Sequence, residues 1–128
     1  MKTNQEILDE YGSIIVNRIL DRYYRGIKKE INEGCKNPNS KKFNQVFEKL
    51  DTEEKALLKK YIFENINSLI FDFLGVFEEH PQFKIIYEED TMQVDLTKIS
   101  EMLKSEPIIE NGWIKRFSKE IEKDESQA

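Results

Sequence analysis

The segment INSLIFDFLGVF, residues 66–77, is the most apolar part of this chain, and it decides how the rest can fold. Each residue of an α-helix advances about 100° around the axis. At that spacing, Ile62 and most of the apolar residues of this segment share one wide arc. The opposite side collects Glu64, Asn65, Ser68, Asp72, Gly75 and Glu79. We therefore expect a central core helix on which Asp72 faces solvent, with Phe71 as the exception near the polar side.

This central helix is predicted to begin at Asp51 or Thr52 and to end at Glu79. Both residues at its start are good N-caps, and the acids that follow them suit the positive end of the helix dipole. The helix ends near Glu79 because the residue before Pro81 disfavours helical backbone. The apolar run is well short of the roughly 20 residues that span a bilayer.

A second long helix is predicted over about residues 3–33. Thr3 and Glu6 have capping-box spacing at its start, and Gly34 provides a stop. Its apolar residues fall on two faces about half a turn apart, and the change occurs near Gly12-Ser13. We expect a bend or a break at that point; the alternative is an N-terminal patch that faces a partner.

Shorter elements complete the prediction. Short helices fit residues 40–50, residues 95–104 and a last segment that Asn111 can cap, and the Trp113 ring at its start is expected to fold onto the core. Alternating apolar residues predict a small β-hairpin at about residues 83–96, which turns near 88–91. They are Phe83, Ile85 and Tyr87 before the turn, and Met92, Val94 and Leu96 after it.

These elements predict a mainly α protein, a compact helical domain of two long and several short helices. The chain has 128 residues, of which 38% are hydrophobic, so a single domain over 1–128 can bury a core. Residues from about 122 to 128 are expected to form a frayed tail. The expected core includes Leu20, Ile27, Phe47, Leu58, Ile66, Phe73, Phe77, Trp113 and Phe117.

Charge and cysteine content narrow the functional classes. The formal net charge of -5 argues against general affinity for nucleic acid or anionic membrane. Cys35 is the only cysteine, so a disulfide-stapled secreted domain is excluded. The first ten residues lack the basic end and apolar run of a secretory signal, and the expected location is therefore the cytoplasm.

Few residues could carry catalysis. Cys35 and His80 are the only thiol and the only imidazole, one in a loop and the other at a helix end, and the sequence does not support their contact. They are too few for the usual zinc ligands, and the chain has neither EF-hand spacing nor a glycine-rich phosphate loop. We expect no metal, no cofactor and no enzymatic activity; a carboxylate-based enzyme is the least favoured alternative.

A basic stripe lies along the first predicted helix, formed by Arg18, Arg22, Arg25 and Lys29 at i, i+4, i+7 and i+11. A solvated face, partly neutralised by Asp21 and Glu30, is the first interpretation. The alternatives are an anionic protein partner or phosphate contacts in a nucleic-acid-associated or regulatory protein. Tyr23 and Tyr24 are expected to lie toward the core, which weakens the nucleic-acid alternative.

Two segments of the last third carry a resemblance, IYEEDTMQVDLTKISEML and NGWIKRFSK. They resemble small, mostly uncharacterised bacterial helical proteins in which an acidic turn leads to a short helix and a Gly-Trp-Ile helix closes the chain. Some of those look like immunity-type proteins encoded beside toxins. The resemblance implies a bacterial interaction protein and carries over no site residues.

The hypothesis that follows is a non-enzymatic protein-binding module, of which an immunity or toxin-neutralising protein is one concrete form. It would occlude a basic partner by matching it in shape and charge. The candidate contacts are acids near the end of the central helix and in the hairpin turn: Glu78, Glu79, Glu88, Glu89 and Asp90. Partner and oligomeric state are left open by the sequence.

Overall fold

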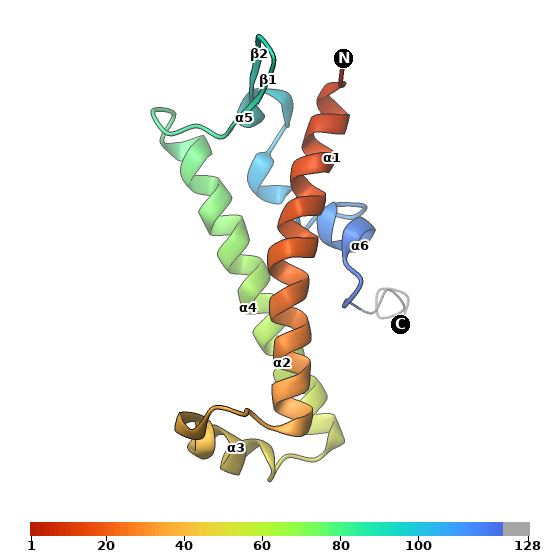
Figure 1. Ribbon diagram of the computed structural model, residues 1–128, viewed down its shortest axis with the longest axis vertical. Helices are drawn as coiled ribbons and strands as arrows, with labels where there is room; N and C mark the ends of the chain where they lie inside the picture. Colours follow the sequence, from red (N-terminus) through yellow and green to blue (C-terminus); the bar gives the residue numbers. More distant parts are fainter. Residues whose placement is uncertain (122–128) are drawn as a thin grey trace.

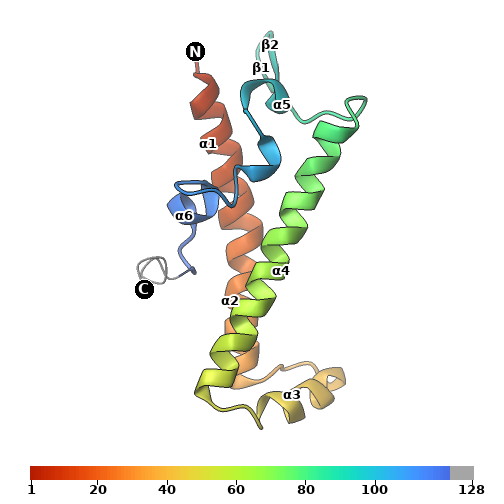
Figure 2. The ribbon, with the colours of Figure 1, turned by 180° about the vertical axis from the view of Figure 1, so that it is seen from behind.

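Two long helical rods form the frame of the molecule in the computed structural model, which describes residues 1–121 (Figures 1 and 2). The predicted frayed tail at 122–128 lies outside the described residues. The mainly α class is confirmed. The helices are α1 (Asn4–Ile15), α2 (Asp21–Glu33), α3 (Lys41–Phe47), α4 (Thr52–Glu79), α5 (Leu96–Ile99) and α6 (Trp113–Phe117). Single turns lie at η1 (Val16–Leu20), η2 (Pro38–Ser40) and η3 (Leu103–Ser105).

The first rod is continuous and joins α1, η1 and α2. Thr3 and Glu6 form the predicted capping box. The expected bend or break at Gly12-Ser13 is wrong, because the helix passes through these residues and changes pitch further on. η1 is a π-helical turn, in which the Asp21 N–H donates to the Val16 carbonyl five residues back. The wider turn takes up an extra residue, so Ile15 before it, Leu20 at its end and Tyr24 after it are buried in the same core.

The second rod is α4, which begins at an Asp51–Glu54 capping box and ends at His80. It packs against α2 and η3. The Tyr24 ring lies 4.8 Å from the Phe63 ring between the rods, and the Tyr24 hydroxyl donates a hydrogen bond to the Asn67 side chain. Asp72 is exposed, as predicted. Phe71 is half-buried under Lys104, whose Nζ lies 5.2 Å from the ring centre.

A two-stranded antiparallel hairpin follows α4, as predicted, with strands β1 (Ile86–Glu89) and β2 (Met92–Asp95). Glu89 pairs with Met92, so the turn is Asp90-Thr91. Asp90 adopts a φ of 54°, the left-handed conformation that tight hairpin turns require and that Asp tolerates. Figure 1 places the hairpin at the α1 end of the molecule and α3 at the opposite end.

The last helix, α6, packs against the first rod through Trp113, which is fully buried as predicted. The indole lies directly on Gly12, and the Tyr11 ring meets it edge-on at 5.8 Å. The predicted cap is wrong by one residue: Gly112 is the N-cap of α6. Asn111 has a φ of 59° and belongs to the preceding turn.

The expected core is partly correct. Leu20 and Trp113 are buried, and six of the expected residues are half-buried: Ile27, Phe47, Leu58, Ile66, Phe77 and Phe117. The prediction that Phe73 belongs to the core is wrong, because 54% of its surface is exposed. α4 carries apolar residues on more of its circumference than α2 and η3 can cover, and Phe73 lies on the uncovered part.

The contact between Gly12 and Trp113 yields a prediction with an internal control. A Cβ atom on Gly12 would lie 2.5 Å from the indole ring, so Gly12→Ala should lower the free energy of unfolding by about 1–3 kcal/mol. Gly26→Ala places its Cβ in open space on α2 and should raise that free energy by roughly 0.5–1 kcal/mol. Urea denaturation measures both; equal effects of the two substitutions would contradict this packing.

Arg116 of α6 donates a hydrogen bond to Asp9 of α1 at 3.0 Å, and this bond lowers the pKa of the Asp9 carboxyl. Because the folded pKa is below the unfolded value, the carboxylate stabilises the fold above the unfolded pKa. The stabilisation is lost as pH falls through the folded pKa. Asp9→Asn should therefore lower the free energy of unfolding at pH 7, by less than about 1 kcal/mol for a partly exposed pair. At acid pH the Asp9 carboxyl of the wild type is protonated in both the folded and the unfolded state, and the two proteins should then be equally stable. A difference in the free energy of unfolding that persists there would refute the assignment.

Candidate protein interface

An exposed apolar ridge runs along α4 on its uncovered side. Leu57, Tyr61, Leu69 and Phe73 are 70%, 65%, 69% and 54% exposed, and together with Asn65 they occupy every fourth position. Positions four apart form a continuous row on a helix surface, inclined to its axis. We call these five residues the α4 ridge. It is an ordered, rigid surface, because its backbone belongs to the longest helix of the fold.

The ridge opens onto a groove at its N-terminal end, between α4 and the segment that includes α3. The groove encloses about 760 Å³, and its apolar lining comes from both sides. Val46 of α3 and Leu50 contribute one side, and Leu57, Leu58 and Tyr61 contribute the other. Glu54, Lys60 and Glu64 form its polar lining, so the groove has the apolar centre and charged margin of a protein-binding surface.

Folding does not require the ridge to be apolar. The side of α4 that faces the core supplies buried Leu74, and half-buried Phe63, Ile66 and Ile70 pack against that core. Beyond its N-terminal end, which adjoins α3 across the groove, the side of α4 turned away from α2 carries no other described helix or strand in Figure 1 or Figure 2. The ridge is therefore an exposed apolar row on a helix that the core already anchors.

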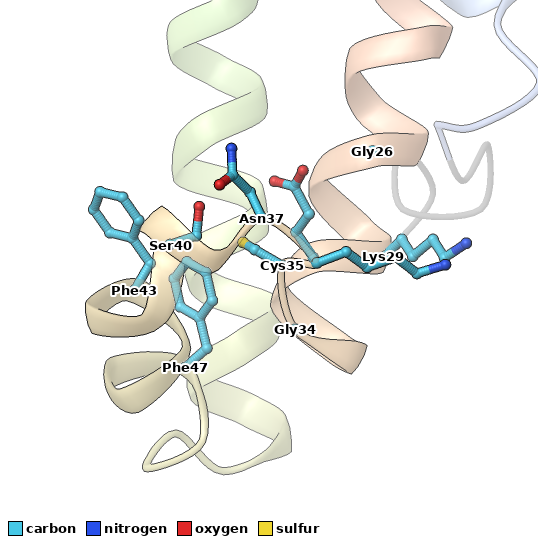
Figure 3. Close-up of a pocket in the computed structure, with 10 residues that line it drawn as sticks. Gly26, Lys29, Gly34, Cys35, Asn37, Ser40, Phe43 and Phe47 are labelled. Carbon is cyan, nitrogen blue, oxygen red and sulfur yellow. The ribbon is translucent and has the colours of Figure 1, made fainter.

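A second hollow lies between the end of α2 and α3 and encloses about 530 Å³ (Figure 3). Cys35 lines it, together with Lys29, Phe43 and Phe47. Asn44 fixes this loop, since its side chain accepts a hydrogen bond from the Cys35 N–H at 2.7 Å and donates to the Cys35 carbonyl at 2.9 Å. Cys35 is thus part of a well-held loop.

The structure separates the two residues that could have formed a thiol–imidazole pair. Cys35 precedes α3, and His80 caps the far end of α4. The 28 residues of α4 span roughly 42 Å. Figure 1 shows α3 and the C-terminal end of α4 at opposite ends of the molecule, so Cys35 and His80 cannot act together.

Residues 1–121 contain no group of three or more His, Cys, Asp or Glu side chains that could hold a metal ion. Burial raises the pKa of Glu106, and the Arg116 charge opposes that shift. Glu106 lines neither of the two hollows described above, so its shifted carboxyl has no adjoining cavity there in which to act on a substrate.

The basic stripe is exposed at all four of its positions on the first rod. The Arg25 guanidinium lies 3.3 Å from the Glu120 carboxylate, and Lys28 pairs with the same carboxylate. The positive charge of the stripe is therefore partly neutralised by the C-terminal segment. The neutralising role expected for Asp21 is wrong, because Asp21 is buried. Of the two tyrosines expected to lie toward the core, Tyr24 is buried and Tyr23 is 59% exposed.

Asp21, predicted to be a surface acid, is instead buried and holds the C-terminal segment on the first rod. Its carboxylate accepts hydrogen bonds from the Ser118 hydroxyl at 2.5 Å and from the Lys119 N–H at 2.9 Å. The Ser118 oxygen in turn accepts from the Glu120 and Ile121 N–H groups. Burial and the Asp21 charge together raise the pKa of Tyr24. One sequence signal could have indicated that Asp21 is buried: it lies three residues before Tyr24 and so on the same side of the helix.

The candidate acidic contacts lie at one end of the molecule, at the end of α4 and on the hairpin (Figure 1). Glu78 is half-buried and accepts from the Lys104 N–H at 2.6 Å. Glu88 accepts from Gln93 at 2.7 Å, and Glu89 accepts from the Tyr87 hydroxyl. Glu79 and Asp90 are exposed and make no side-chain hydrogen bond or ion pair with the described residues.

The described residues define a mainly α-helical protein with an exposed apolar row on its longest helix. The model described as "Family of unknown function (DUF6547)" matches residues 5–120, and the chain belongs to this family. The match includes both segments that carry the resemblance noted above. No curated protein and no solved structure matches the chain. Within residues 1–121, the helices are too short or too polar to cross a membrane.

The buried position of Asp21 yields a prediction. Asp21→Asn retains one acceptor oxygen but places an amide N–H₂ group where the second donor is bound, so one buried polar group loses its partner. The free energy of unfolding should fall by about 1–3 kcal/mol. Asp72→Asn, the same change at an exposed position of α4, should change it by less than about 0.5 kcal/mol. Thermal and urea denaturation measure both, and equal stabilities would show that Asp21 is not held as described.

Proposed function

We propose that this protein is a non-enzymatic protein-binding module and that its binding surface is the α4 ridge with the adjoining groove. The observation that carries the proposal is the exposure of four large apolar side chains on one row of an anchored helix. A helix in this state supplies apolar contact area without the entropic cost of ordering a loop, which favours binding.

The composition of the surface supports a protein as the ligand. Tyr and Phe are enriched at the centres of protein interfaces, and large aliphatic side chains complete their apolar cores. The ridge and groove combine Tyr61 and Phe73 with leucines from two segments. A groove of this kind beside a helix receives an amphipathic helix from the partner, with its anchors spaced every three or four residues.

A toxin-neutralising protein in a bacterial cytoplasm is the more specific form of this proposal. The net charge of -5 and the exposed Glu79 and Asp90 at one end favour a basic partner, whose association they would accelerate. Neutralisation would then be steric, with the partner's active surface covered by the helical frame.

The test is capture of partners from soluble extract of the source organism with the tagged full-length chain. Leu69→Lys places a charge at the centre of the ridge and should reduce the recovery of a specific partner by at least about tenfold, which corresponds to roughly 1.4 kcal/mol. Ile19→Lys makes the same kind of change at another exposed apolar position, on the first rod, and should leave recovery unchanged.

Mass spectrometry of the recovered proteins, with circular dichroism of both variants to confirm folding, gives the readout. Identical recovery of every partner by wild type and Leu69→Lys would refute the assignment of the ridge as the binding surface.

A further inference from the structure

We propose that the occupant of the α4 ridge is a second copy of this chain, packed antiparallel about a two-fold axis that passes close to Asn65. The inference rests on the proposed function in one respect, namely that the ridge is a protein interface. It adds the identity of the partner, the symmetry of the assembly and the residue at its centre.

The chain exposes more surface than a compact monomer of its mass, as expected if a partner covers part of it. Its accessible surface is 9343 Å², whereas a compact monomer of 15.3 kDa exposes roughly 7,100 Å². The excess is about 2,200 Å². Subtracting the most surface that seven residues can expose, roughly 1,100 Å², leaves about 1,100 Å². A standard interface buries about 800 Å² on each partner, so the excess is sufficient for a stable dimer.

The order of residues along the ridge is symmetric. Leu57 and Tyr61 precede Asn65 by eight and four positions, and Leu69 and Phe73 follow it by four and eight. A two-fold axis at Asn65 therefore places Tyr61 against Leu69 of the second copy and reciprocally, with Leu57 and Phe73 at the outer ends. This is a closed, self-complementary interface, the commonest arrangement among homodimers. Rows of this inclination on two helices run parallel to each other at a crossing angle near -50°.

Asn65 suits the centre of such an interface. Within the described residues, its side chain makes one hydrogen bond, from Nδ2 to the Tyr61 carbonyl at 2.8 Å. The second Nδ2–H can donate to the Asn65 Oδ1 of the second copy, and Oδ1 can accept from the Asn65 Nδ2–H of that copy. Two Asn side chains across a two-fold axis can thus satisfy each other. A single polar residue in an apolar helix interface fixes the register of the two helices.

Charge favours the antiparallel arrangement over the parallel one. Asp72 follows Asn65 by seven residues, nearly two helical turns, so it shares the same face of α4. A parallel pair would place Asp72 against its own copy, and such like-charge contacts are costly. About a two-fold axis at Asn65, Asp72 instead lies opposite Leu58 of the second copy, and the two carboxylates are far apart. The dipoles of the two α4 helices also oppose each other in this arrangement.

The oligomeric state is the first test. Sedimentation velocity over a concentration series should show wild type at twice 15.3 kDa, dissociating on dilution. Leu69→Lys should sediment at 15.3 kDa at concentrations where wild type is dimeric. Ile19→Lys should behave as wild type.

Disulfide trapping tests the axis. Facing Cα atoms of helices whose axes are 8–10 Å apart are separated by roughly 3.5–5.5 Å, which overlaps the range for a disulfide. In a Cys35→Ser background, Asn65→Cys should therefore form a covalent dimer under mild oxidation. Leu57→Cys, equally exposed on the same ridge, lies roughly 12 Å from the axis and about 20 Å from its own copy. It should remain monomeric on a non-reducing gel.

The outcomes separate the two proposals. Wild type at 15.3 kDa across the series overturns this inference, while the loss of an extract partner by Leu69→Lys would still support the ridge as a protein interface. A dimer that Leu57→Cys traps as readily as Asn65→Cys is parallel and also overturns the inference. A dimer unaffected by Leu69→Lys and not trapped by Asn65→Cys uses another surface and overturns it as well.

Discussion

The contact between the Trp113 indole and the backbone of Gly12 is the constraint on which the rest of the structure depends. The bulkiest buried side chain of the chain lies where only a residue without a side chain leaves room for it. This contact attaches α6 to the first rod. On that rod, Asp9 lies before Gly12 and Asp21 lies after it, and their hydrogen bonds to Arg116 and Ser118 strengthen the attachment. The loop that contains η3 is thereby held against α4, and it completes the core between the two rods.

A core built this way covers only part of α4. One rod and a short loop lie against a helix of 28 residues, and beyond the groove with α3 no further described helix or strand lies on its outer side. The apolar residues on that outer side are a surplus with respect to folding, and exposing them in an isolated monomer is unfavourable. Covering them with protein, whether another chain or a second copy, recovers the hydrophobic free energy that the monomer leaves unused.

Much of the fold could be predicted because its signals are local. The capping boxes at Thr3 and Asp51, the end of α4 before Pro81 and the alternation around Asp90-Thr91 depend on residues within a few positions of one another. The candidate site was predicted less well. The basic stripe and four of the five candidate acids are exposed as expected, whereas Glu78 is half-buried. Helical periodicity favours a core position for Phe73 and a surface position for Asp21, and it does not reveal the α4 ridge.

The sequence by itself determined that the chain is mainly helical, where the two long rods begin and end, and that α4 is apolar over a wide arc. Only the tertiary structure decided which part of that arc is buried. Helical periodicity is a property of a single segment, whereas burial depends on what packs against it. A buried acid such as Asp21 and an exposed Phe73 become distinguishable only when Ser118 and Lys119 reach the first rod and no other described element covers Phe73 on the outer face of α4.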